Sequence, residues 1–201
     1  AQLRIYEPND ALAQQLVDNM GVVAMPSSVD LLSDCDVVVL AVKPQVMQVA
    51  LQALNGASVK PGAFFISIAA GIPIASMQGW LGGSHPVVRV MPNTPALVGA
   101  GISGLFASEE VSEQQREAAE SVLRAVGSVI WVDSEALIDS VTAVSGSGPA
   151  YFFYFIESLE KAALEQGLNA EQARILSLET AFGAAKLALE SDQNAATLRQ
   201  R

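Results

Sequence analysis

The run Val37-Val38-Val39-Leu40-Ala41-Val42 decides the fold class, because it is apolar at every position. A strand in an antiparallel sheet with one wet face would alternate apolar and polar residues. A continuous apolar run instead predicts a strand buried on both faces of a parallel sheet. Residues 63–68 and 87–91 are two further runs of this kind.

Helical stretches separate these apolar runs. Residues 45–54, 74–81 and 113–126 have helical spacing, and a short strand at 3–6 precedes a first helix that Asn9 caps. Strands that alternate with helices predict right-handed βαβ units, and therefore an α/β fold with a doubly wound, mostly parallel sheet. Residues 101–106 and 129–132, on either side of the 113–126 helix, extend the pattern.

The character of the chain changes near Asp133. Strand-like runs give way to helices, expected at 134–144, 149–166 and 170–190, with a last one starting at Ala195. We therefore predict an α/β domain over residues 1–133 and an all-helical domain over 134–201. The helix from Pro149 is apolar around much of its surface, which is typical of a helix buried in a core or a subunit interface. Both ends of the sequence are expected to be cut, because it opens in what resembles a second strand and stops within a helical run.

Composition excludes several classes of protein. The 201 residues are 51% hydrophobic and 16% charged, as in a globular chain. The net charge of -10 is not interrupted by a basic cluster, so nucleic acid and anionic membranes are not expected partners. A single cysteine excludes an internal disulfide, and with no long apolar span or leader it predicts a cytoplasmic protein.

Three loops are expected to meet at one edge of the sheet, where ligands of open α/β sheets bind. Lys43, with Pro44 fixing the turn, follows the first run and faces a phosphate or ribose, unless it is a surface lysine at a helix start. Residues 67–71 are small enough to let a flat ring approach the backbone, or they are an ordinary strand exit. Asn93 and Thr94 are the polar groups of a loop stiffened by two prolines; they orient a small polar substrate, unless Asn93 only bonds its own backbone.

Two further features are weaker. The turn Ser145-Gly146-Ser147-Gly148-Pro149 opens a long helix whose free N–H groups can receive a carboxylate, although a plain helix–helix junction explains these residues better when they are taken alone. Glu7 closes the first strand, where an acid can bind a ribose or simply face solvent in a turn. His85 is expected to be a surface residue, Cys35 lies between two aspartates and is not expected to be a nucleophile, and no metal site is predicted.

Four segments occurring together resemble pyrroline-5-carboxylate reductases in order and spacing. They are Ala41-Val42-Lys43-Pro44-Gln45, Ser67-Ile68-Ala69-Ala70-Gly71, Val88-Arg89-Val90-Met91-Pro92-Asn93-Thr94-Pro95-Ala96 and Ser145-Gly146-Ser147-Gly148-Pro149-Ala150-Tyr151. The resemblance implies a Rossmann-like domain followed by a helical dimerisation domain, often within a larger ring. It also implies reduction of 1-pyrroline-5-carboxylate to L-proline by NADPH or NADH, the last step of proline biosynthesis.

The resemblance also assigns residues. It implies cofactor-binding positions at Glu7, Ser28, Ala41, Val42, Lys43, Pro44, Ala69, Ala70 and Gly71. It implies substrate-binding positions at Glu135, Ser145, Gly146, Ser147, Gly148 and Pro149. Glu135 is alternatively a first-turn acid that the helix dipole favours. The family's opening glycine-rich loop and a later substrate loop are not in the sequence, so activity of these 201 residues alone is not expected.

The mechanism that these residues support needs no covalent nucleophile. An imine becomes electrophilic when its nitrogen is protonated or hydrogen-bonded, so the protein has to orient cofactor and substrate and exclude water. Asn93 and Thr94 are expected to do this positioning. The alternatives are a related 3-hydroxy acid dehydrogenase, disfavoured because Lys161 is the only lysine of the 149–166 helix, and a non-catalytic binding protein derived from the reductase.

Overall fold

The computed structural model describes residues 2–200, which form two compact units, one up to Gly146 and one from Ser147. The first unit is α/β and the second is all helical, as the sequence predicts. Within residues 2–200 no helix is both long and apolar enough to cross a membrane.

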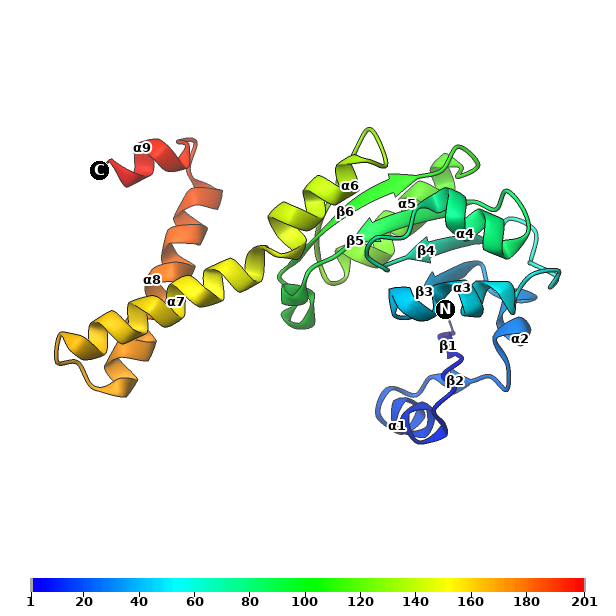
Figure 1. Cartoon of the computed structure of the whole chain (residues 1–201), viewed down its shortest axis with the longest axis horizontal. Coiled ribbons are helices and arrows are strands. Elements are labelled where there is room, and N and C mark those ends of the chain that lie inside the picture. The colour runs from blue at the N-terminus through cyan, green and yellow to red at the C-terminus, as the bar shows by residue number, and fades with distance from the viewer. Residues whose placement is uncertain (1, 201) are drawn as a thin grey trace. The chain divides into compact units, whose positions relative to one another are not determined.

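The first unit contains a five-stranded sheet (Figure 1). Its strands, in spatial order, are β3 (Val37–Leu40), β4 (Phe64–Ser67), β5 (Val87–Met91), β6 (Gly101–Ala107) and β7 (Gly127–Trp131). All neighbours are parallel except β5 and β6. Residues 92–100 between these two strands are fewer than the dozen or so that a parallel crossover needs, so β6 runs back beside β5. The predicted mostly parallel sheet is confirmed.

Two shorter strands form a parallel pair of their own, β1 (Arg4–Ile5) with β2 (Val23–Ala24). The helix α1 (Asp10–Met20) joins them and begins as predicted at Asn9, whose side chain accepts the Leu12 N–H. The helix α2 (Ser28–Leu32) follows β2. Neither β2 nor α2 was expected from the sequence, because both are too short to show a period.

Helices cover the five-stranded sheet on both faces. On one face α3 (Pro44–Gln52) and α4 (Ile74–Leu81) pack on Phe65 and Val87. On the other face α5 (Glu113–Arg124) packs on Phe64 and Ile66. Successive residues of one strand thus lie in different cores, which explains why β4 is buried at every position.

The prediction that residues 37–42 are buried on both faces is wrong. The strand β3 ends at Leu40, and the Val39 side chain is 48% exposed. The reason is that α5 packs over β4, β5 and β6, so no described element covers Val39 on that face. Val38 and Leu40 project from the opposite face and belong to the core beneath α3 and α4.

The helix expected at 134–144 is shorter and changes type. It consists of α6 (Leu137–Val141) and then a π-helical turn, η2 (Thr142–Gly146). The hydroxyls of Thr142 and Ser145 donate back to the carbonyl oxygens of Ile138 and Val141. Such back-bonding competes with the regular ladder, and single π turns often occur at functional sites.

The second unit is a helical hairpin followed by a short helix. Its elements are α7 (Gly148–Glu165), α8 (Ala170–Glu190) and α9 (Ala195–Arg199). Gly167 adopts φ 93° after α7, and Asn169 caps α8 in a reciprocal capping box with Gln172. The buried residues of α7 and α8 are all small (Gly148, Ala173 and Ser177).

Candidate functional site

The ends of three parallel strands define the candidate site. Because β3, β4 and β5 are mutually parallel, their carboxyl ends reach the same edge of the sheet. The segments that follow them are 41–44, 68–71 and 92–94, as the sequence predicts. The 3₁₀ helix η1 (Thr94–Val98) connects β5 to β6 at this edge.

The segment after β3 is open to solvent. Ala41, Val42 and Lys43 are exposed, and Lys43 occupies the N-cap position of α3, directly before Pro44. The lysine makes no ion pair with any residue of the described range. A mobile ammonium group at the carboxyl edge of the sheet is suited to an anionic or hydroxyl-rich ligand.

The segment after β4 leaves the sheet in small residues. The Ser67 side chain is fully buried, and its Oγ accepts a long hydrogen bond of 3.4 Å from the Ala69 N–H. Gly71 has φ 74°, the left-handed conformation that glycine adopts without strain, and it turns the chain toward α4. Ala70 and Gly71 are exposed, so a flat group can approach this backbone without meeting a large side chain.

The segment after β5 presents an oriented amide. Asn93 Oδ1 accepts a 3.0 Å hydrogen bond from the Ile102 N–H on β6. Because that donor can only face the amide oxygen, the bond fixes which end of the side chain is Nδ2. The NH₂ group of Asn93 therefore turns away from β6 as a pre-oriented donor. Thr94 is exposed at the first position of η1.

A close approach at Gly146 joins the π turn to the end of β5. A Cβ placed on Gly146 would lie 2.5 Å from Met91 Cε, so a larger residue at this position would require the Met91 side chain to move. Ser145, in the same turn, is half-buried. The structure thus brings Ser145 and Gly146, the part of this predicted substrate segment that lies in the first unit, next to Met91 at the end of β5.

The remaining residues of that segment belong to the second unit. Ser147 precedes α7, and its side chain makes no capping hydrogen bond. Gly148 is buried, and Pro149 lies in the first turn. A proline in the first turn needs no N–H partner, so the helix begins here without strain.

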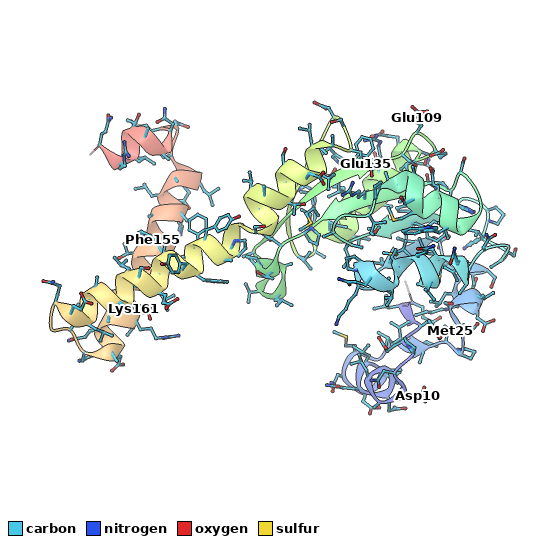
Figure 2. All side chains as sticks on the ribbon, viewed as in Figure 1. Asp10, Met25, Glu109, Glu135, Phe155 and Lys161 are labelled. Atoms are coloured by element: carbon cyan, nitrogen blue, oxygen red, sulfur yellow. The ribbon has the colours of Figure 1, made fainter. Side chains whose placement is uncertain are left out.

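Two donors hold the carboxylate of Glu135, a residue labelled in Figure 2. Its Oε1 accepts 2.7 Å from the Ile74 N–H at the start of α4 and 3.0 Å from Arg89 Nη1 on β5. The Glu135 side chain is 29% exposed, so it is anchored without being sealed. Sequence reasoning gave Arg89 no role. Its position in the apolar run 87–91 nevertheless indicates a role, because a charged residue inside an apolar strand requires a buried partner.

Glu7 and Ser28 lie in the β1–β2 part of the first unit. Glu7 Oε1 accepts the Asn9 N–H at 3.0 Å, which is a turn contact, and the Glu7 side chain is half-buried. Ser28 is the first residue of α2, whose cap is Ser27. Arg4 pairs with Asp34 at 2.5 Å. Among the described residues, no strand pairing joins β1 and β2 to the sheet that carries the other segments.

Charged and aromatic groups elsewhere have structural partners. His85 is half-buried rather than fully at the surface, and its ring meets Phe65 edge-on at 5.6 Å. The hydrogen bond that Lys60 donates to Asp36 raises the pKa of Lys60, and one that Ser108 donates to Glu110 lowers the pKa of Glu110. Both groups lie away from the edge described above.

Comparisons with known proteins agree with this layout. Residues 135–201 match a family model described as pyrroline-5-carboxylate reductase dimerisation, and residues 1–71 match one described as NADP oxidoreductase, coenzyme F420-dependent. The pyrroline-5-carboxylate reductase of Pseudomonas aeruginosa is 48% identical over 201 residues, which is 100% of this chain and 73% of that protein.

Solved structures extend the likeness to three dimensions. A pyrroline-5-carboxylate reductase from Coxiella burnetii is 40% identical with a TM-score of 0.91, covering 98% of this chain and 73% of that one. The pyrroline carboxylate reductase of Plasmodium falciparum, solved with NADP bound, is 31% identical with a TM-score of 0.85, covering 98% and 72%.

The residues at the sheet edge fit a nicotinamide dinucleotide. The cation at Lys43, the small exit at Ala70 and Gly71 and the parallel strand ends are what such a ligand needs. Identity at this level over the whole chain favours the reductase family over the alternative of a 3-hydroxy acid dehydrogenase. The chain belongs to the pyrroline-5-carboxylate reductase family, whose members are oxidoreductases that reduce 1-pyrroline-5-carboxylate to L-proline with NADPH or NADH.

Proposed function

We propose that the reduction takes place at the shared carboxyl edge of β3, β4 and β5. The packing of Gly146 on Met91 is the observation that carries this proposal, because it places a second predicted ligand segment at the end of β5. In this arrangement the first two strand ends hold the cofactor, and the β5 loop with the π turn holds the substrate.

The cofactor positions that we propose are those of the two open segments and the β1 region. Lys43, following Ala41 and Val42 and preceding Pro44, supplies the charged contact, and the segment of Ala69, Ala70 and Gly71 supplies the flat surface. Glu7 and Ser28 are assigned to the adenosine half, because the acid that follows the first ligand-binding strand bonds the ribose in dinucleotide folds. When bound, the nicotinamide supplies a hydride to the imine carbon.

The substrate positions are the amide of Asn93, the hydroxyl of Thr94, Glu135 and the segment from Ser145 to Pro149. The pre-oriented NH₂ of Asn93 donates to a polar atom of the substrate, which limits rotation of the ring. Glu135 presents the carboxylate edge not used by Arg89 and Ile74, which favours a protonated ring nitrogen. Hydride addition at the imine carbon would move the π electron pair of the C=N bond onto nitrogen, which would keep the proton that Glu135 favours.

Substituting Asn93 tests this assignment in the intact enzyme. Asn93→Asp keeps the oxygen that Ile102 needs but removes both donors, so we expect kcat/KM for pyrroline-5-carboxylate to fall roughly 100-fold. The matched control is Asn55→Ala, which changes an exposed asparagine after α3. If Asn93→Asp keeps full activity, measured as NADPH oxidation, the proposed role of Asn93 in substrate binding is wrong.

We also propose that a second copy of the chain covers α7 and α8. Tyr151, Phe152, Phe153, Tyr154 and Phe155 are consecutive residues, each at least 60% exposed, so they surround the helix rather than lining one side. Apolar surface of this extent marks an interaction site. The match of residues 135–201 to a dimerisation domain supports a homodimer, alone or within a ring of dimers.

Domain boundary and compartment are proposed on smaller grounds. We propose 1–133 as the dinucleotide-binding domain and 134–201 as the helical substrate and dimerisation domain, which the family match beginning at residue 135 supports. The compact units divide later, at Gly146, because α6 packs on β5 and β6. A single cysteine fits a reducing compartment, so we propose a cytoplasmic enzyme.

A further inference from the structure

Arg89 is a charged residue in the middle of the sheet. It lies on β5 between Val88 and Val90, and its side chain is 6% exposed. Nη1 bonds Glu135 at 3.0 Å, and Nη2 reaches Asp139 on α6 at 3.5 Å. Nε is buried and has no hydrogen-bond partner among the described residues.

Stability alone does not account for this arrangement. Taking a guanidinium out of water costs free energy that an ion pair repays only with good geometry and with every donor satisfied. Here one donor is unsatisfied, and one partner, Asp139, is 79% exposed at the limit of hydrogen-bond distance. An apolar side chain would fill the same space without these costs, so the value of Arg89 lies in what it holds in place.

Arg89 is connected to both halves of the proposed site. Through Glu135 it reaches the Ile74 N–H, the start of the helix that follows the Ala69–Gly71 segment. Through Asp139 it reaches α6, which continues into the π turn of Ser145 and Gly146. All of these residues lie within the first compact unit.

The same strand fixes the far end of this connection. Arg89 and Met91 are two residues apart on β5, so they project from the same face of the sheet. Met91 is the side chain on which Gly146 packs. The strand β5 therefore contacts α6 through Arg89 and the π turn through Met91.

We propose that Arg89 is a positioning residue for hydride transfer. It orients Glu135. Through Glu135 it holds the proposed cofactor segment before α4 at a fixed position relative to the proposed substrate turn after α6. This inference rests on the proposed roles of those two segments. Arg89 touches neither ligand, so its loss affects the alignment of the reacting atoms more than the binding of either molecule.

The test uses Arg89→Met and Arg89→Lys in the intact enzyme. Met fills the volume without charge, whereas Lys restores one bond to Glu135 but not the two-pronged contact. For Arg89→Met we expect kcat to fall roughly 100-fold, because a misplacement of about 1 Å has that effect. We expect the NADPH Kd and the substrate KM to change by less than about threefold. Arg89→Lys should recover part of kcat.

Two readouts separate positioning from a merely structural role. With the nicotinamide deuterated at C4, the isotope effect on kcat should rise in Arg89→Met, because the chemical step becomes more rate-limiting. The matched control is Arg124→Met, which breaks the exposed Arg124–Glu120 pair of α5 and should leave kcat and the isotope effect unchanged. A kcat per folded molecule that stays at the wild-type value in Arg89→Met, with only Tm lowered, would overturn the proposal.

Arg89→Lys keeps the question decidable if Arg89→Met does not fold. A folded Arg89→Lys with wild-type kcat and isotope effect would also overturn the inference, and a reduced kcat with a raised isotope effect would support it. Asn93→Asp, assayed in parallel, reports on the proposed site separately. If Asn93→Asp loses activity while both Arg89 variants keep it, the site stands and only the role of Arg89 fails.

Discussion

The strands β4 and β5 and the helix α7 are comparably apolar, yet they lie in opposite environments. Phe64, Phe65 and Ile66 of β4 are at most 2% exposed, because helices of the same unit cover both faces of the sheet. On α7, Phe153 and Phe155 remain at least 60% exposed. The first unit thus buries its apolar side chains, whereas the second leaves the aromatic side chains of α7 exposed. Apolar content alone does not distinguish these two situations.

Breaking the exposed surface should have the largest effect. Phe155→Glu places a charge in the proposed interface, twice in a symmetric dimer, and we expect association to weaken by about 4 kcal/mol, or roughly a thousandfold. Sedimentation over a range of concentrations measures this. Both tryptophans, Trp80 and Trp131, lie in the first unit, so their fluorescence should remain native.

The control for this experiment is a neighbouring exposed residue. Lys161→Gln removes the surface pair of Lys161 with Glu157 on α7, an i,i+4 contact that contributes about 0.3–0.5 kcal/mol. Its dimer should be almost unaffected (both Phe155 and Lys161 are labelled in Figure 2). If Phe155→Glu sediments like the wild-type dimer, the aromatic surface of α7 is not the interface.

The contrast between the units also shows how far sequence can predict a structure. The buried runs at 63–68 and 87–91 and the helix capped by Asn9 follow from periodicity and capping, which are local signals. Val39 does not, because its exposure depends on which helix lies over the edge of the sheet. The antiparallel turn into β6 similarly depends on the length of the 92–100 connection.

The candidate site divides in the same way. The segments of Lys43, Gly71 and Asn93 are found in the sequence because each follows a strand. The hydrogen bonds at the site are not found there, because Ile102 to Asn93 and Arg89 to Glu135 each join a strand to a residue outside that strand. The contact of Gly146 with Met91 also joins residues far apart in the chain. In the sequence, only the lack of a side chain at Gly146 indicates this contact.

A weaker version of the contrast occurs within the first unit. The helix α1 has no buried residue, and β1 pairs only with β2 among the described strands, so Glu7 lies in a loosely packed region. We expect Glu7→Ser to shift the kcat/KM preference toward NADPH by roughly tenfold, or about 1.4 kcal/mol. The reason is that a carboxylate repels a 2′-phosphate, and Arg4 is already paired with Asp34.

Measuring kcat/KM with NADH and NADPH in both proteins tests this. Asp10→Asn, which removes an exposed carboxylate in the first turn of α1, is the control and should alter the ratio by less than the Glu7 variant does. A wild type that strongly prefers NADPH, with an unchanged ratio in Glu7→Ser, would mean that Glu7 serves only its turn contact with Asn9.

The smallest expected effect concerns the attachment of α5 to the sheet. Glu120 on α5 accepts the Trp131 Nε1–H at 2.9 Å and pairs with Arg124, and these contacts, Trp131 first, lower the pKa of Glu120 below its usual 4.5. A carboxyl group whose pKa is lower in the folded state stabilises the fold above its unfolded pKa and loses that contribution as pH falls through the folded pKa.

Glu120→Gln still accepts the indole hydrogen but carries no charge. The wild type should therefore have a slightly higher Tm than Glu120→Gln at neutral pH, and the difference should vanish as the pH falls through the folded-state pKa of Glu120. Glu117→Gln, an exposed neighbour on the same helix, should show no such pH-dependent difference. A constant Tm difference across this range would show that Glu120 contributes through packing rather than through its charge. The attachment of α5 to β7 would then not depend on an electrostatic interaction of Glu120.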